Sequence, residues 1–237
     1  MIGVLGGLGS AATVDFLANV VECTPATCDQ DHLPMTVLFV PQTPDRSAHV
    51  MHAGQDPWPM LRWGIQSLLA QHVGVIAVAC NNAHHWHAAM SQLSPVPILH
   101  IAQACVKRIV AEPGARVALF GTRGTLQSGF YQAHLTQAHW RIALPTPSMQ
   151  TDIDACITQV KAGQIEHARQ TMQGLLDRVP ALGANVVILG CTELPIAARG
   201  CHAPGLTWVD SNRCLAQEVV SHALAHGWSR RPGPLRP

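Results

Sequence analysis

The sequence predicts an α/β protein built from two diverged copies of one unit, each with a mostly parallel sheet flanked by helices. Short apolar, β-branched runs alternate with longer helical patterns along the 237 residues. The short runs are apolar throughout, which is typical of strands that helices cover on both faces of a parallel sheet. Similar segments also recur, with two cysteines at matching places 111 positions apart. Together these observations predict two related halves.

Each expected strand is a short run of mainly Val, Ile, Leu and Ala, bounded by polar or turn residues. In chain order, strands are expected at 2–5, 36–40, 75–79, 98–100, 117–120, 142–144, 186–189 and 206–209. The longer stretches between them carry apolar residues at helical spacing. In chain order, helices are expected at 11–22, 57–71, 83–92, 103–111, 126–138, 153–161, 166–178 and 213–226.

An internal repeat sharpens this interpretation. Three pairs of segments match: 3–7 with 117–122, 37–41 with 141–145, and 75–81 with 186–192. Chance similarity between apolar strands is the alternative explanation. The third pair argues against chance, because Cys80 and Cys191 both follow the carboxyl end of a buried strand. Two diverged copies of one α/β unit explain all three matches.

The repeat also predicts the division of the chain. We expect a first α/β domain at 1–102 plus 206–228, because the last helix is expected to return to it. The second domain is expected at 103–205, and the tail rich in Pro and Arg at 229–237 is expected to be flexible.

Composition excludes several classes of partner. Lys plus Arg is 15 and Asp plus Glu is 14, so the formal net charge is only +1. Binding nucleic acid or an anionic membrane surface needs a cationic excess, and aromatic residues, at 5%, are too few for base-stacking platforms. Hydrophobic residues make up 48% and charged residues 12%, which predicts a folded chain and leaves room for a subunit interface. We therefore expect neither nucleic acid nor membrane as a partner.

A cytoplasmic location is expected. The apolar runs are of strand length and far below the roughly 20 residues of a membrane span. The start resembles no secretory signal, because the first basic residue is Arg46. In a reducing compartment the eight cysteines are expected to be thiols, most of them small apolar core residues.

Two of these cysteines lie in motifs that indicate chemistry. They are Cys80-Asn-Asn-Ala-His84 and Cys191-Thr-Glu193. Ligands of open α/β sheets bind beyond the carboxyl ends of the strands, so the two thiols are expected on opposite walls of one cleft. Each motif alone also fits a core cysteine at a strand end. Because the two cysteines form a matched pair across the repeat, a functional role is the stronger interpretation.

Two facing thiols suit the inversion of a stereocentre by proton transfer. A base must remove the proton from one face of the carbon while an acid supplies one to the other face, and a cysteine can take either role. The carbon acid is weak, so a substrate carboxylate must be held by groups that stabilise developing charge.

Taken with Gly3-Val-Leu-Gly-Gly-Leu-Gly9 and Pro44-Asp-Arg46, these motifs resemble the aspartate/glutamate racemase superfamily, and in particular its cofactor-independent aspartate racemases. The resemblance runs from residue 2 to about residue 214. It implies two α/β domains in pseudo-two-fold relation, an active site in the cleft between them, a small amino acid as substrate, no cofactor or metal, and frequently a homodimer.

The resemblance also assigns residues. It implies that Cys80 and Cys191 are catalytic. The matching substrate-binding positions are Arg46, Asn81, Asn82, Thr122, Thr125, Lys161 and Thr192. Among these, Arg46 and Lys161 match cationic positions that recognise carboxylates. The positions that hold the α-carboxylate and amino group are matched by Asn81, Thr122, Thr125 and Thr192.

Two departures bear on the substrate. The family usually has Thr where this chain has Asn82, a longer side chain that could alter the size of the pocket. The glutamate-racemase branch usually has His where this chain has Glu193, which favours aspartate. Alternatives are a glutamate or broad-specificity amino-acid racemase, an isomerase of another small carboxylic acid, and a non-catalytic amino-acid-binding protein.

Two cofactor interpretations are weaker. Residues 7–12 fit G-x-G-x-x-A after a strand, but the second expected strand ends without the acidic residue of a dinucleotide site, so a tight turn is expected instead. Cys80, His84, His85 and His87 could suggest a metal. Adjacent histidines diverge on a helix, whereas a closed zinc site needs four converging ligands.

Overall fold

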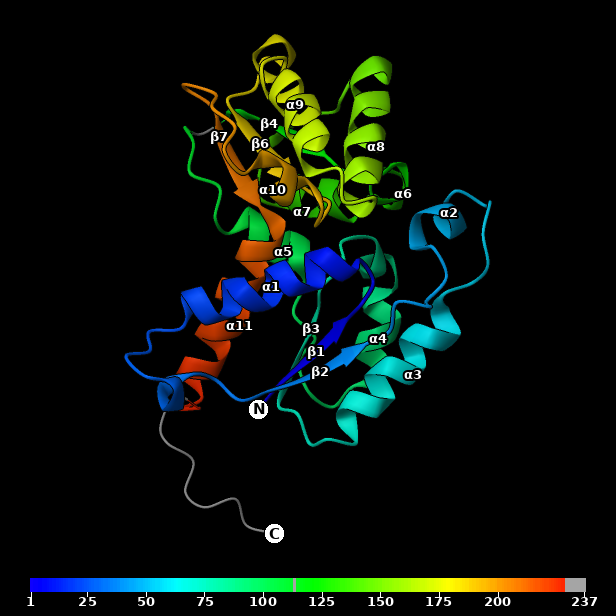
Figure 1. Ribbon diagram of the computed structural model, residues 1–237, viewed down its shortest axis with the longest axis vertical. Helices are drawn as coiled ribbons and strands as arrows, with labels where there is room; N and C mark the ends of the chain where they lie inside the picture. The colour runs from blue at the N-terminus through cyan, green and yellow to red at the C-terminus, as the bar shows by residue number, and fades with distance from the viewer. Residues whose placement is uncertain (113, 229–237) are drawn as a thin grey trace.

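The computed structural model describes residues 1–112 and 114–228, and it contains two parallel sheets in separate halves of the molecule (Figure 1). The tail at 229–237, expected to be flexible, lies outside the described residues. No helix within the described ranges is both long and apolar enough to cross a lipid bilayer.

The first sheet has the strand order β2-β1-β3, with β1 (Ile2–Gly6), β2 (Met35–Phe39) and β3 (Val75–Val78). Its side chains alternate between two apolar layers. Val4 points into the layer formed with α1 (Ser10–Cys23) and α11 (Ser211–Ala225), whereas Leu5 packs against α3 (Trp58–Leu69). Helices therefore cover both faces, as the continuous apolar runs predict.

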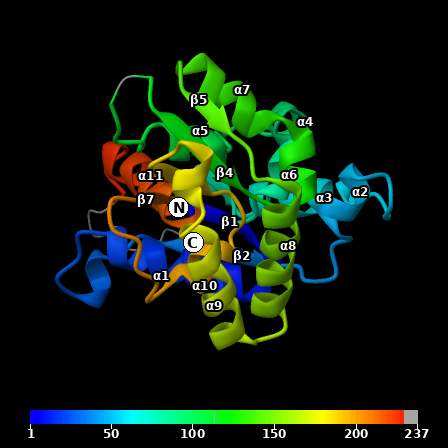
Figure 2. The same ribbon diagram turned by 90° about the horizontal axis from the view of Figure 1, so that it is seen from above.

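The second sheet has the order β5-β4-β6-β7, with β4 (Arg116–Phe120), β5 (Arg141–Ala143), β6 (Val186–Leu189) and β7 (Thr207–Asp210). Alternation again divides the core, as Ala118 and Leu119 belong to opposite layers. One layer is completed by α8 (Pro147–Lys161), α9 (Ile165–Leu176) and α10 (Leu194–Ala198). The other is completed by α5 (Ile101–Val106) and α7 (Phe130–Gln137), on the far side of the sheet (Figure 2).

The strand order confirms the internal repeat. The central strands β1 and β4 correspond, with β2 and β5 on one side and β3 and β6 on the other. Even the outer neighbour has a counterpart: Ile98 forms a single parallel bridge to Ile76 where β7 pairs with β6. The matching cysteines consequently follow equivalent strands.

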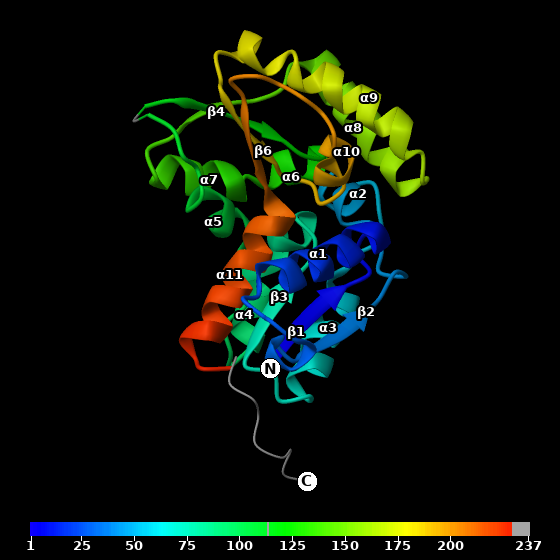
Figure 3. The ribbon, with the colours of Figure 1, turned by 60° about the vertical axis from the view of Figure 1, so that its left-hand side comes forward.

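The expected assignment of 206–228 to the first domain is wrong for its strand. The backbone of β7 pairs with β6 in the second sheet, and Val209 packs in the core of that half. The following helix α11 packs on the first half, where Leu215 and Val219 lie in the layer with β1 (Figure 3). We therefore propose units at 1–102 plus 211–228 and at 103–210.

Some elements differ from expectation for local reasons. The strand expected at 98–100 is only the bridge at Ile98, and the helix expected at 103–111 ends at Val106. Gly129, with φ +72°, divides the helix expected at 126–138 into α6 (Arg123–Ser128) and α7. The helix expected at 83–92 is a 3₁₀ segment (Asn82–Trp86) followed by α4 (His87–Leu93). Short elements not expected are α2 (Arg46–Val50), α10 and the 3₁₀ segments Asp29–Asp31 and Val179–Leu182.

The turn after β1 requires glycine. Gly7 has φ +78°, and a Cβ there would lie 2.4 Å from the backbone nitrogen of Val40. The Thr13 hydroxyl accepts a hydrogen bond from the Gly7 N–H at 2.8 Å, which ties the turn to the first turns of α1. This close packing directs Leu8 toward the space between the two halves, where it lines a pocket.

Candidate active site

A small pocket lies beyond the carboxyl ends of the strands, between the two halves. Its lining residues are Leu8, Asp45, Arg46, Cys80, Asn81, Asn82, Thr122, Lys161, Cys191, Thr192 and Glu193. Eight of the nine residues assigned from the sequence are among them, and the ninth, Thr125, hydrogen-bonds to Asn82 from behind this lining. The free volume is about 10 Å³, which is room for roughly one water. This space must widen before an amino acid fits between the two cysteines.

The two cysteines reach this pocket from equivalent places. Cys80 follows β3 in the first half and Cys191 follows β6 in the second, and each is 5% exposed. Both line the same small space, although 111 residues separate them in the sequence. The docking of the two halves therefore places two thiols in one pocket.

Glu193 is a pocket residue whose role the motif analysis missed. Its Oε2 accepts a hydrogen bond from the Cys191 thiol at 3.0 Å and lies 3.3 Å from the Thr192 hydroxyl oxygen. Burial raises the pKa of Cys191 well above that of an ordinary thiol, and the carboxylate of Glu193 raises it further. The ligand-free site thus holds Cys191 as a protonated thiol. The sequence signal that could have identified Glu193 is its place in the second motif, two residues after Cys191.

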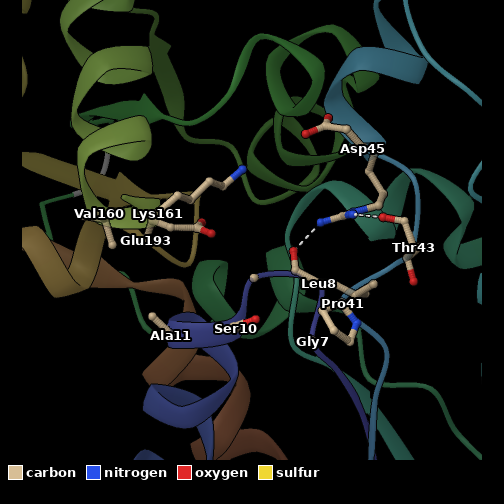
Figure 4. Close-up of a pocket in the computed structure, with 12 residues that line it drawn as sticks. Gly7, Leu8, Ser10, Ala11, Pro41, Thr43, Asp45, Val160, Lys161 and Glu193 are labelled. Carbon is tan, nitrogen blue, oxygen red and sulfur yellow. Dashed lines mark hydrogen bonds between the residues drawn. The ribbon is translucent and has the colours of Figure 1, made fainter. Parts of the chain in front are cut away.

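Lys161 places a positive charge on the same wall. Burial opposes the charge on the Lys161 ammonium, but the acidic groups around it, of which Glu193 contributes most, together outweigh burial and raise the pKa of Lys161 above its ordinary value. Lys161 is therefore an ammonium ion near neutral pH. Figure 4 shows the Lys161 side chain extending beside Glu193, toward the wall formed by Thr43 and Asp45.

Arg46 lies on that opposite wall, at the start of α2, and is braced by backbone oxygens. It donates to the carbonyls of Thr43 and Pro44, each at 3.0 Å, and also to that of Leu8. Its buried Nε has no partner among the described residues. Arg46 and Lys161 also border an outer cavity of about 340 Å³, large enough for an amino acid.

Asn81 is committed to structural contacts more than the sequence suggests. Its Oδ1 accepts a hydrogen bond from the Tyr131 hydroxyl at 2.6 Å, and its Nδ2 donates to the Ser211 hydroxyl at 2.9 Å. All three residues are buried, and Ser211 begins the helix that returns the chain to the first half. Asn81 therefore links the halves at the deep end of the pocket, with one N–H left for a ligand.

The histidines of the first motif do not converge on the Cys80 thiol. The Nδ1 of His84 lies 2.9 Å from the Cys80 carbonyl oxygen, the Nδ1 of His85 contacts the Ser128 hydroxyl, and the Nε2 of His87 contacts the Ile98 carbonyl. Burial, with a smaller contribution from His87, lowers the pKa of His84 to about 4. His84 is thus a neutral core residue that supports the strand end.

This burial predicts a pH-dependent stability. Above pH 6.5 both folded and unfolded His84 are neutral; between pH 6.5 and about 4 only the unfolded form binds a proton, so the free energy of unfolding falls. The loss from His84 reaches roughly 3 kcal/mol at pH 4. Asp210 has the opposite effect. Burial raises its pKa to about 6, so the folded form binds a proton before the unfolded form does, and the contribution of Asp210 to the free energy of unfolding rises as the pH falls.

Urea unfolding of the wild type and the His84→Gln variant at pH 7.5 and 5.5 isolates the contribution of His84. The variant should lose about 1 kcal/mol less than the wild type on acidification. Replacing the exposed His202 by Gln is the control and should leave the wild-type difference unchanged. Equal pH dependence in His84→Gln and wild type would contradict the prediction.

Comparison with known proteins identifies the family. The family model described as Asp/Glu/Hydantoin racemase matches residues 5–219. This chain belongs to the Asp/Glu/hydantoin racemase family. It is 27% identical over 231 residues to the broad specificity amino-acid racemase RacX of Bacillus subtilis, covering 95% of this chain and 99% of that protein.

Other relatives of this racemase differ in substrate. A glutamate racemase of Thermus thermophilus is 31% identical over 194 residues, covering 76% of this chain and 68% of that one. The structure of the Picrophilus torridus aspartate racemase superimposes with a TM-score of 0.82 at 25% identity, covering 94% and 93% of the two chains. These comparisons establish an amino-acid racemase and its two-domain fold, and they leave the choice of amino acid to the site.

Proposed function

We propose that this racemase interconverts the L and D forms of aspartate by proton transfer at Cα between Cys80 and Cys191, without a cofactor. The observation that carries the proposal is the pair of buried cysteines, delivered to one pocket by equivalent strands of the two halves. A proton acceptor and a proton donor on opposite sides of one carbon are what inversion requires.

The protonation of the resting site suggests how a turnover begins. Cys191 is a thiol, so in one direction Cys80 removes the α-proton as a thiolate and Cys191 delivers its own proton to the other face. The substrate gains one proton and loses one, and the proton has moved from Cys191 to Cys80. In the reverse direction Cys191 acts as the base. The forward step leaves Cys191 as the thiolate that this requires, and Glu193, 3.0 Å from its sulfur, accepts the thiol hydrogen bond when Cys191 is protonated.

Two cationic side chains of the pocket suit an acidic substrate. Arg46 and Lys161 lie on facing walls and can bind a carboxylate each, and Asp45 and Glu193 in the same lining balance their charges before substrate binds. The structural similarity to an aspartate racemase and the small inner volume favour aspartate over glutamate. Broad specificity is the second candidate, since the Bacillus subtilis relative with that description matches over 95% of this chain.

We further propose a homodimer that works in the reducing cytoplasm. All eight cysteines are free thiols in the structure, which fits a reducing compartment. The edge strand β2 exposes Val37 and Phe39, an apolar surface that a second subunit could cover.

A panel of L-amino acids, assayed by chiral chromatography, tests the function. The protein is first dialysed against a strong chelator and assayed without pyridoxal phosphate or nucleotide. We expect D-aspartate to form fastest, D-glutamate more slowly, and alanine slowest, because it lacks the second carboxylate. Turnover that disappears on dialysis and returns with a metal or cofactor would contradict the cofactor-independent mechanism. Racemisation of neutral amino acids as fast as aspartate would favour the broad-specificity alternative.

A further inference from the structure

We propose that Tyr131 is a positioning residue, which holds the side-chain amide of Asn81 with an N–H directed at the substrate carboxylate beside the reacting carbon. The inference rests on the proposed function and deepens it, because it names a residue outside the pocket lining that sets how fast the α-proton is transferred. It concerns the carboxylate that every amino acid carries, so it holds for aspartate and for any other amino-acid substrate.

Tyr131 lies close to both of the strand ends that carry the cysteines of the pocket. It belongs to α7, is fully buried and is the only tyrosine of the chain. Its hydroxyl oxygen lies 2.6 Å from the Oδ1 of Asn81, the residue after Cys80. A Cβ on Gly190, the residue before Cys191, would lie 3.2 Å from the Cε2 atom of the Tyr131 ring. The ring therefore supports the second strand end, and the hydroxyl reaches the first.

The direction of the hydrogen bonds at the Tyr131 hydroxyl follows from the groups that surround it. An amide oxygen can only accept, so Tyr131 donates its one hydroxyl proton to Asn81. The Cys105 sulfur lies 3.4 Å from the same hydroxyl oxygen, and it consequently donates to that oxygen as a thiol. Burial raises the pKa of Cys105 and that of Tyr131 well above their ordinary values, so both groups keep their protons near neutral pH.

These donors determine which end of the Asn81 amide is available to a ligand. Its Nδ2 donates one hydrogen to the Ser211 hydroxyl at 2.9 Å and makes no other hydrogen bond among the described residues. Turning the amide over would leave the Tyr131 proton only the Cys105 sulfur, which is a weak acceptor. Asn81 lines the pocket, and the free group that it offers there is therefore an N–H donor.

A donor at this place suits the charge that develops during proton transfer. Asn81 directly follows Cys80, so a ligand group beside its amide is close to the carbon from which Cys80 removes the proton. The electron pair of the broken C–H bond moves toward the α-carboxylate oxygens, where a preorganised N–H stabilises the transition state more than the bound substrate. An amide that rotated freely would present its oxygen for part of the time and repel the carboxylate.

Tyr131→Phe removes the hydroxyl and keeps the ring beside Gly190. We expect kcat to fall about 10- to 100-fold while KM stays within threefold, because the lost stabilisation is largest in the transition state. Rates are measured by chiral chromatography on the amino acid that the wild type racemises fastest. Thr24→Val is the matched control and should keep the wild-type kcat, because it also removes a buried hydroxyl, which donates to the Val20 carbonyl at the end of α1 remote from the pocket.

A role through Asn81 requires that the effects of the two substitutions are not additive. In the background of Asn81→Ala, Tyr131→Phe should change kcat less than twofold further. An equal loss in both backgrounds would show that the hydroxyl only supports the fold and would overturn the proposal, as would a wild-type kcat in Tyr131→Phe.

Ser211→Ala removes the other partner of the Asn81 amide and provides a second test, which decides if circular dichroism shows that Tyr131→Phe is unfolded. Its kcat should fall at least threefold, and only where Asn81 is present. An equal fall with and without Asn81, or no fall at all, would contradict the positioning of the amide. Fastest racemisation of an amino acid other than aspartate would refute the proposed substrate and leave these comparisons valid.

Discussion

Replacing either Cys80 or Cys191 by serine is expected to abolish racemisation and to leave the fold intact. Serine is nearly isosteric with cysteine, and both side chains border a pocket, so little packing is lost. A serine hydroxyl is too weak an acid to supply an alkoxide near neutral pH. Because inversion needs both a donor and an acceptor, each variant should lose about 10³-fold or more in kcat.

Chiral chromatography of the product, with circular dichroism to verify folding, measures this loss. Serine at the exposed Cys28 is the matched control and should retain wild-type turnover. The other cysteines outside the pocket should also tolerate serine with activity retained, at an ordinary packing cost where they are buried. Near-normal racemisation by Cys80→Ser or Cys191→Ser would make that cysteine structural and refute the argument from the repeat.

Arg46→Ala should weaken the binding of aspartate far more than that of alanine. Losing a sheltered, charge-assisted hydrogen bond to a carboxylate costs roughly 1.5–3 kcal/mol, or about 10- to 100-fold in affinity. The substitution also releases the carbonyls of Thr43, Pro44 and Leu8, which loosens the turn after β1. That second effect weakens the binding of aspartate and of alanine alike. The difference between the two losses of affinity therefore reports the lost carboxylate contact.

Competition binding or KM values for both amino acids measure the difference. Arg62→Ala is the control, because Arg62 is exposed on α3, and it should change neither value. Equal losses for aspartate and alanine in Arg46→Ala would show that Arg46 supports the turn without recognising the side-chain carboxylate.

The arrangement of strands could be predicted from the sequence because burial on both faces leaves a local signal, an uninterrupted apolar run. The repeat added which strands correspond, and the strand order confirmed it. The sheet to which β7 belongs could not be predicted, since an apolar run is equally suited to either sheet. The pairing of β7 with β6 is decided by long-range packing, such as the burial of Val209 in the core of the second half. The break at Gly129 had a local signal, a glycine at the end of a helical pattern.

The part of the site that lies at the ends of strands could be predicted from the sequence. The positions of Cys80 and Cys191 follow from the rule that parallel strands present ligands at their carboxyl ends. The partners of the neighbouring amides depend on how the halves dock, which no short segment encodes. Asn81 bonds to Tyr131 and Ser211, which are 50 and 130 residues away, and Asn82 bonds to Thr122 and Thr125.

The central claim is that two cysteines act on opposite faces of one carbon, and α-proton exchange in deuterated water tests it most directly. Each single serine variant is incubated separately with L- and D-aspartate, and deuterium at Cα is followed by NMR. The account predicts a crossed pattern: neither variant racemises, and each exchanges the α-proton of one enantiomer only, opposite for Cys80→Ser and Cys191→Ser. Exchange of the same enantiomer by both variants, or of both enantiomers by one of them, would contradict the two-base mechanism.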